Sequence, residues 1–165
     1  MRMTLEQSKN PSITVAQEIE SLKLYLSLES LRFSDQFDLD IHTAPELDIH
    51  NTLIPSCILQ PLVENSIWHG LLNKKTKGKL LVRFKVDNNR TICIVDDSGH
   101  GDKRQTVKTN HESTGLLNLK ERIDLINKGM REQISFTISS SMFATETYPG
   151  FRVEISIPNE LNKHI

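Results

Sequence analysis

The stretch KLLVRFKVDNNRTICIVDD, residues 79–97, constrains the fold more than any other part of the chain. It contains two apolar runs, Leu80–Val86 and Thr91–Val95, which are rich in β-branched residues and predict two strands. Between these runs, Asp87-Asn88-Asn89 supplies residues that favour a tight turn. A hairpin this apolar requires a sheet with a covered face, so the remaining segments must supply further strands and the elements that cover them.

Helical spacing of apolar residues predicts three helices, over Thr14–Phe33, Leu59–Leu72 and Gly115–Lys128. The inward positions expected in the first are Val15, Ile19, Leu22, Leu26, Leu28 and Leu31, and those in the third are Leu116, Leu119, Ile123 and Ile126. Pro61 is tolerable only near the first turn of the second helix, and Gly129 ends the third.

Three more segments predict strands, namely FDLDI (Phe37–Ile41), QISFTISS (133–140) and FRVEISIP (151–158). Pro45–Pro55 is expected to be a loop, as is the polar segment 102–114. Helices and mainly antiparallel hairpins in this order predict the α+β class, as a two-layer sandwich of one domain.

Composition excludes several classes of protein. The 165 residues carry a formal net charge of −1, which gives no general attraction to nucleic acid. No apolar run is long enough to span a bilayer, and there is no signal-peptide pattern. The two cysteines, Cys57 and Cys93, lie in apolar runs and are expected to be buried free thiols.

Polar residues at the end of the second predicted strand indicate a binding site. In IVDDSGHG, Asp97 precedes Gly99 and Gly101, so a carboxylate that can accept hydrogen bonds from an amino group stands beside a backbone that other atoms can approach closely. Gly115 opens a helix, whose N-terminus suits phosphate. Asn65 and His69 lie four residues apart on one helix face, and an Asn side-chain oxygen suits Mg²⁺.

Together these features describe a site for ATP, since an amino-bearing base, a phosphate chain and Mg²⁺ are all provided for. Each feature alone is also common in structural roles. An Asp-Gly turn at the surface, a polar pair on a helix and a helix-capping glycine are ordinary, and Trp68 alone is typical of a core residue. Their order along the chain is what favours ATP.

Four segments together resemble the sensor histidine kinases of the LytS/YehU type. YLSLESLRF (Tyr25–Phe33) is similar to the helix that precedes the family's ATP-binding domain, and IPSCILQPLVENSIWHGL (Ile54–Leu71) is similar to its N box. VDDSGHG corresponds to the G1 box, and STGLLNLKERI (Ser113–Ile123) corresponds to the G2 box with its following helix. The resemblance runs from about Leu5 to Pro158.

The resemblance implies a Bergerat fold of the GHKL superfamily, in which helices cover one face of a mixed, mainly antiparallel sheet and an extra helix stands at the N-terminus. It implies that Asp97 binds the adenine amino group and that Asn65 ligates Mg²⁺ and acts in catalysis with Glu64. The other nucleotide-binding residues that it implies are His69, Gly99, Gly101, Thr114, Gly115 and Leu116. Segment 102–114 becomes the ATP lid.

The sequence also departs from the family pattern. Ser98 replaces the usual Asn of the G1 box, Ser113 replaces the first glycine of the G2 box, and Trp68 stands where many relatives have Lys. None of the six histidines has the setting of the family's phosphoacceptor. We therefore expect a catalytic domain at 14–160, a linker from the acceptor-helix region at 1–13 and a tail at 161–165.

The family further implies a parent that is an inner-membrane sensor with this domain in the cytoplasm. Its partners would be the acceptor-helix region, as a homodimer, and a response regulator of the LytTR kind. Two alternatives stay open. The chain could be a GHKL ATP hydrolase, although Pro61 stands where that group has its water-activating Glu. It could also be a kinase-like interaction module without ATP binding, which the substitution at Ser113 favours.

Overall fold

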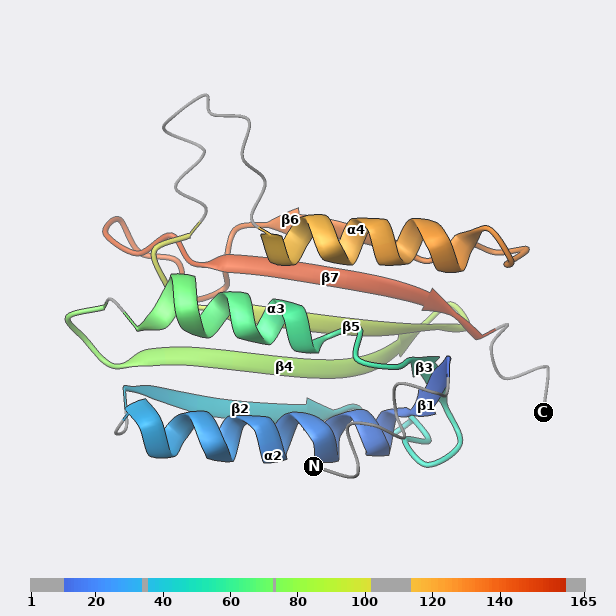
Figure 1. Ribbon diagram of the computed structural model, residues 1–165, viewed down its shortest axis with the longest axis horizontal. Helices are drawn as coiled ribbons and strands as arrows, with labels where there is room; N and C mark the ends of the chain where they lie inside the picture. Colours follow the sequence, from blue (N-terminus) through green and yellow to red (C-terminus); the bar gives the residue numbers. More distant parts are fainter. Residues whose placement is uncertain (1–10, 34–35, 73, 102–113, 160–165) are drawn as a thin grey trace.

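A five-stranded sheet forms one layer of the protein (Figure 1) in the computed structural model, which describes residues 11–33, 36–72, 74–101 and 114–159. Its strands are β2 (Phe37–Thr43), β4 (Gly78–Asp87), β5 (Arg90–Asp97), β6 (Ser135–Ser139) and β7 (Phe151–Pro158). They lie in the order β2-β4-β5-β7-β6. Strand β2 runs parallel to β4, and the other neighbours are antiparallel. The predicted α+β class and mainly antiparallel sheet are confirmed.

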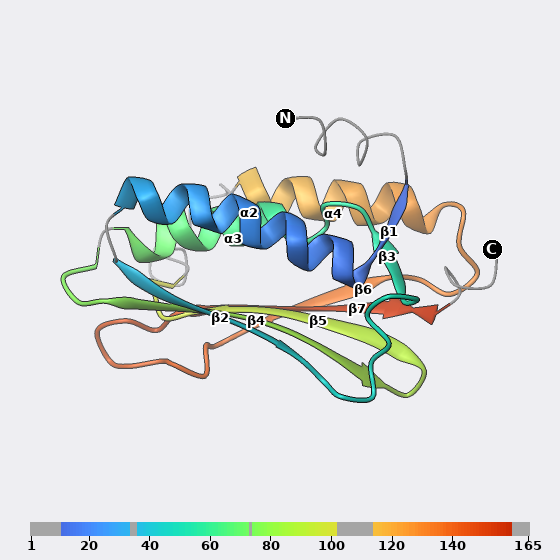
Figure 2. The ribbon, with the colours of Figure 1, turned by 90° about the horizontal axis from the view of Figure 1, so that it is seen from below.

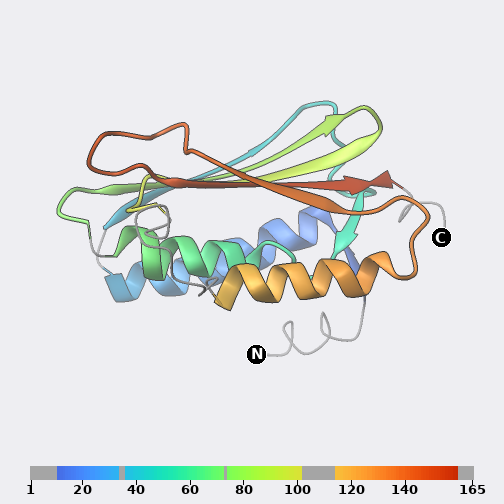
Figure 3. The same cartoon turned by 90° about the horizontal axis from the view of Figure 1, so that it is seen from above.

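Helices form the second layer and cover a single face of the sheet, as Figures 2 and 3 show from opposite sides. They are α2 (Val15–Phe33), α3 (Gln60–Asn65), η1 (Ser66–Leu71) and α4 (Thr114–Asn127). Helix α3 lies between α2 and α4. None of the helices within the described ranges is long and apolar enough to cross a membrane.

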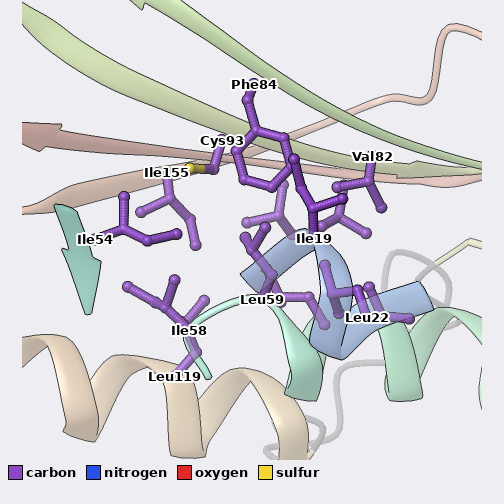
Figure 4. Packing of buried hydrophobic residues seen from close by; sticks show 14 of the residues in the cluster. Ile19, Leu22, Ile54, Ile58, Leu59, Val82, Phe84, Cys93, Leu119 and Ile155 are labelled. Carbon is purple, nitrogen blue, oxygen red and sulfur yellow. The ribbon is translucent and has the colours of Figure 1, made fainter. Parts of the chain in front are cut away.

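The central hairpin of β4 and β5 forms as its sequence predicts. Its strands extend beyond the predicted bounds at both ends, and Asn88 and Asn89 occupy the turn with φ values of 45° and 62°. Asparagine tolerates this left-handed conformation better than most residues do. The hairpin register places Phe84 opposite Cys93, and both side chains point into the helical layer (Figure 4).

The core lies between the two layers. Fully buried apolar side chains from the sheet meet those of all the helices, including Phe84, Cys93, Ile155, Leu22, Ile58, Leu59 and Leu119. Burial on this scale, at roughly 25 cal/mol per Å² of apolar surface, is the main force that holds helices on the sheet. Cys93 is buried as expected, but Cys57 is only half-buried.

Helix α2 buries a narrower stripe than its sequence predicts. Val15, Ile19, Leu22 and Leu26 are buried as expected. Leu28 and Leu31 are 55% and 82% exposed, so their assignment to the core is wrong. The physical reason is helical geometry, because positions 28 and 31 fall outside the 3.6-residue stripe that contains positions 15, 19, 22 and 26.

Residues 45–55 do not form the uninterrupted loop that their prolines predict. Leu53–Pro55 forms strand β3, which pairs antiparallel with β1 (Ser12–Thr14) in a separate two-stranded sheet. β1 crosses the expected domain boundary between residues 13 and 14, and Ile13 in it is buried. Pairing between segments forty residues apart is a tertiary effect that local turn residues do not reveal.

The second predicted helix has two parts rather than one. Pro61 lies in the first turn of α3 as expected, but from Ser66 the helix widens into the π-helical turn η1. The amide of Leu72 bonds to the carbonyl of Ile67, five residues back. Single π-turns inside α-helices are frequent at functional sites because they change the direction of the side chains that follow.

Candidate functional site

Asp97 lies in the centre of the site, at the end of β5. The predicted strand ends at Val95, but β5 continues through Asp97, which pairs with Leu80 on one side and Phe151 on the other. Only 1% of Asp97 is exposed. Its Oδ1 accepts a hydrogen bond of 2.8 Å from the amide of Gly99, and the hydroxyl of Ser66 in η1 also bonds to the carboxyl. The carboxyl thus faces the helical layer.

The pKa of Asp97 is raised to about 6, chiefly by burial and to a smaller extent by the neighbouring charge of Asp96. The hydrogen bonds from Ser66 and Gly99 and the positive charge of Lys74 lower it. A buried carboxyl with a strongly perturbed pKa is expensive to keep in a fold, and such groups occur most often at functional sites.

Asp96 has a different role, although it is adjacent. Successive residues of a strand point to opposite faces, so Asp96 faces away from the helices. Its carboxylate accepts bonds from the hydroxyl of Ser141 and from the amide of Met142, and it forms an ion pair of 3.4 Å with Arg152. These contacts hold the connection between β6 and β7, which gives Asp96 a structural role.

Two glycines bring backbone close to the Asp97 carboxyl. A Cβ on Gly70, in η1, would lie 3.0 Å from Oδ1 of Asp97. A Cβ on Gly99 would lie 2.5 Å from the backbone of Gly70, so these two segments touch. The amide of His100 also bonds to the carbonyl of Gly70 at 3.3 Å. Gly101 has a φ of +68° and packs against Pro149. The turn after β5 is therefore fixed against both η1 and the β6–β7 connection.

Asn65 and Gly115 form a second contact, before Gly70 on the same helical run. A Cβ on Gly115, the second residue of α4, would lie 3.2 Å from the carbonyl oxygen of Pro61 and 3.4 Å from Cβ of Asn65. The N-terminus of α4 thus meets the C-terminal turn of α3. Leu116 is buried in the core, and Thr114 is the first residue of α4.

The remaining predicted residues lie on the outer side of α3 and η1. Glu64 is half-buried and accepts a bond of 2.9 Å from Nε2 of the Gln60 side chain. His69 is exposed, and Trp68 is 43% exposed and bonds to Tyr25 of α2. Ser113 and the expected lid up to residue 113 lie outside the described residues. No group of three or more His, Cys, Asp or Glu side chains that could hold a metal occurs among the described residues.

A buried polar cluster fixes the turn that precedes α3. Glu18 of α2 is 1% exposed and accepts bonds of 3.2 Å from the amides of Cys57 and Leu59. Arg122 of α4 donates to the carbonyl of Ser56 in the same turn. Burial raises the pKa of Glu18, while the two amides and the charge of Arg122 lower it. Helices α2 and α4 are thereby both bound to the turn that precedes α3, the helix that carries Asn65.

Sequence reasoning missed several of these residues. Ser66 and Lys74 act directly on Asp97, yet neither has a pattern that separates it from an ordinary helix or loop residue. Gly70 has a signal, because it matches the N box, but the reason for a glycine there is visible only in the contact with Asp97 and Gly99. Glu18 and Arg122 are charged residues on amphipathic helices, where exposure is the usual expectation.

Comparison of the sequence with known proteins finds relatives that are sensor histidine kinases or sensor proteins. No protein-family model matches the chain. The sensor histidine kinase YpdA of Escherichia coli is 29% identical over 97% of this chain, and the sensor protein LytS of Oceanobacillus iheyensis is 34% identical over 86%. LytS of Streptococcus agalactiae is 32% identical over 98%. The chain spans only about a quarter of the length of these relatives, at 27%, 26% and 27%.

Solved structures agree in fold. The histidine kinase domain from the blue-light activated histidine kinase of Erythrobacter litoralis superposes with a TM-score of 0.63, with 11% identity over 93% of this chain and 71% of that one. The catalytic domain of histidine kinase ThkA superposes with a TM-score of 0.61, with 14% identity over 90% of this chain and 95% of that one. The chain is thus similar, over most of its length, to a segment that makes up about a quarter of LytS-type sensor histidine kinases, and its fold is that of histidine kinase catalytic domains.

Proposed function

We propose that this chain is the ATP-binding catalytic domain of a two-component sensor histidine kinase, which presents Mg²⁺-ATP for phosphoryl transfer to a histidine outside the domain. The observation that carries the proposal is the setting of Asp97. Its buried carboxyl is held by one backbone amide and is flanked by Gly70 and Gly99; a side chain would press on the carboxyl at position 70 and would collide with backbone at position 99. Such a carboxyl can accept the amino group of adenine with a defined direction.

The residues around Asp97 fit a flat base. A side chain at position 70 would begin 3.0 Å from Oδ1 and would occupy the space beside the acceptor. Ser66 and the Gly99 amide hold the carboxyl from its other sides. The carboxyl is thereby oriented before the base binds, which reduces the entropy lost when the complex forms.

Asn65 and Gly115 fit the phosphates and the metal ion. The contact between them supports a site in which Asn65 offers its amide oxygen to Mg²⁺ while the N-terminus of α4 presents the positive end of its helix dipole to the phosphates. Glu64 and His69 lie on the same helical run as Asn65, and Gly101, Thr114 and Leu116 complete the proposed binding residues through the turn after β5 and the start of α4. ATP supplies the phosphoryl group, and the domain's role is to position it.

Hydrolysis of ATP is a weaker alternative. The position where GHKL hydrolases have a water-activating Glu is Pro61, which lies in the first turn of α3 and has no ionisable group. The domain proposed at 14–160 would therefore act with the acceptor-helix region of its parent, connected through residues 1–13 and arranged as a homodimer. A LytTR-type response regulator would accept the phosphoryl group, and the parent would be an inner-membrane sensor with this domain in the cytoplasm.

Calorimetric titration tests the proposal. The purified chain is titrated with ATP or a non-hydrolysable analogue, with Mg²⁺ and then with EDTA. We expect Mg²⁺-ATP to bind with a dissociation constant of roughly 10–1000 µM. Trp68 is the single tryptophan and lies two residues from Gly70, so its fluorescence gives a second signal. An absence of binding in both measurements would refute an ATP site.

A further inference from the structure

We propose that Lys74 is a positioning residue for the base-binding turn, because its ammonium group fixes Ser98 and thereby holds the Asp97 carboxyl in the orientation that accepts the amino group of adenine. This inference rests on the proposed function and extends it. Lys74 lies in the connection between η1 and β4, a segment to which neither the motifs nor the roles proposed above assign a function.

The ammonium group of Lys74 contacts two other segments of the chain. It donates to the backbone carbonyl of Ser98 at 2.5 Å and to the hydroxyl of Ser98 at 3.1 Å. It also lies 4.2 Å from the ring centroid of Tyr148, in the connection between β6 and β7. A cation held over an aromatic face and by two oxygens loses much of its rotational freedom, so it acts as a clamp rather than as a mobile surface charge.

Ser98 transmits this clamp to the site. It is 6% exposed and is held on its other side by β4, because its hydroxyl accepts a bond of 2.8 Å from the amide of Lys79 and its amide donates to the carbonyl of Lys79 at 3.0 Å. Asp97 and Gly99 are its neighbours in the chain. The LytS-type pattern has Asn at this position, so the serine is a departure that the sequence alone leaves without a role. Its short side chain places a hydroxyl within hydrogen-bonding distance of the Lys74 ammonium.

Lys74 also acts on Asp97 through its charge. The groups that surround the Asp97 carboxyl are the Ser66 hydroxyl from η1, the Gly99 amide, and the charges of Asp96 and Lys74. Two other described cations near the turn have different partners. Arg152 of β7 pairs with Asp96 and Glu154, at 3.4 and 3.6 Å.

The ammonium of Lys79 in β4 lies 5.7 Å from the ring centroid of Phe143. Within the described part of the chain, Lys74 is therefore the cation whose charge lowers the pKa of Asp97. Burial lowers the pKa of Lys74 itself, and Asp97 raises it.

The test uses Lys74→Met, which keeps the length of the side chain and removes its charge and its donors. The matched control is Lys75→Met, at the exposed neighbouring lysine. ADP affinity in EDTA, measured by calorimetry between pH 5 and 8.5, reports on the base without the metal ion. We expect Lys74→Met to weaken ADP about tenfold at pH 7.5, in line with the loss of a charge-assisted hydrogen bond. We also expect its affinity to begin falling at a higher pH than that of the wild type, because Asp97 protonates earlier.

Two further variants keep the test decisive if Lys74→Met unfolds. Tyr148→Leu removes the ring under the ammonium, while Tyr148→Phe keeps it, so only the leucine variant should move the pH profile upward. Lys74→Arg keeps the charge and should restore most of the affinity.

If the wild type binds ADP and Lys74→Met binds it equally at every pH, the role of Lys74 is refuted and the ATP site stands. Unchanged profiles for Tyr148→Leu would likewise refute the clamp. If the wild type itself does not bind ADP, the proposed function fails, and the role of Lys74 fails with it.

Discussion

Gly99 lies directly against the backbone of Gly70, so that a Cβ on Gly99 would come within 2.5 Å of three Gly70 backbone atoms. Backbone atoms of a packed helix cannot yield as a flexible side-chain end can. We therefore expect Gly99→Ala to separate the turn from η1, to lower the free energy of unfolding by about 1–3 kcal/mol and to abolish nucleotide binding.

Urea unfolding and ADP titration check this prediction against a matched glycine. Gly129 follows α4, and the nearest atom to a Cβ there is 3.9 Å away, so Gly129→Ala should leave stability and affinity near the wild-type values. Equal behaviour of the two variants would mean that the contact between Gly70 and Gly99 is not required.

Replacing Asp97 by Asn should stabilise the protein without ligand at high pH. The pKa of Asp97 is raised by burial from 3.8 to about 6, so between these values the folded state binds a proton that the unfolded state has released. The burial of the carboxylate therefore costs stability above pH 6, by about 3 kcal/mol, and the cost disappears below pH 4. Asn keeps an oxygen for the Gly99 amide.

Thermal unfolding at pH 4 and pH 8 checks the sign. Asp97→Asn should unfold at a higher temperature than the wild type at pH 8 and at a similar temperature at pH 4, while its ADP affinity falls at least tenfold at pH 8. Asp124→Asn, at an exposed position of α4, is the control and should change neither quantity. A loss of stability at pH 8 would contradict the assignment of Asp97 as a costly functional carboxylate.

Asn65→Ala should weaken ATP binding chiefly when Mg²⁺ is present, because the proposed role of the residue is exerted through the metal ion. The quantity to compare is the ratio of ATP affinities with Mg²⁺ and with EDTA, which should fall about tenfold in the variant. Gly115→Ala should give a smaller loss of the same kind, since its Cβ would press on Pro61 and Asn65. An equal loss in EDTA would make Asn65 structural.

The turn before α3 should depend on the balance between Glu18 and Arg122. Arg122→Met removes the donor to the carbonyl of Ser56 and one of the groups that compensate the charge of Glu18, so we expect a loss of about 1–3 kcal/mol. Glu18→Gln in addition should recover part of it, since the two charges are coupled. Chemical denaturation of both single variants and the double variant measures the coupling. Lys120→Met, exposed on the same helix, is the neutral control.

The sequence predicts the fold well where local pattern and tertiary packing agree. The hairpin of β4 and β5 and the buried stripe of α2 up to Leu26 follow from periodicity and turn residues. Strand β3 and the π-turn η1 could not be predicted, because the first depends on pairing with a distant segment and the second on how the helix fits against Asp97 and Gly99. The role of Lys74 could not be predicted for the same reason, because its partners Ser98 and Tyr148 are distant in sequence and contact it only in the folded protein.

The chain alone should bind ATP without becoming phosphorylated. Phosphoryl transfer requires a nucleophile held in line with the γ-phosphate, and positioning supplies much of the rate. Of the histidines near the proposed site, His69 is exposed on η1 and His100 packs on Tyr148 with ring centroids 5.1 Å apart, so neither is held as a base-activated nucleophile. Incubation with radiolabelled ATP, followed by measurement of acid-labile phosphate, should therefore label a supplied acceptor-helix fragment of the parent kinase and leave this chain unlabelled. The Asp97→Ala variant should label neither, which ties the transfer to the site around Asp97. Acid-labile phosphate on this chain in the absence of the fragment would contradict the prediction, because one of its own histidines would then be the acceptor.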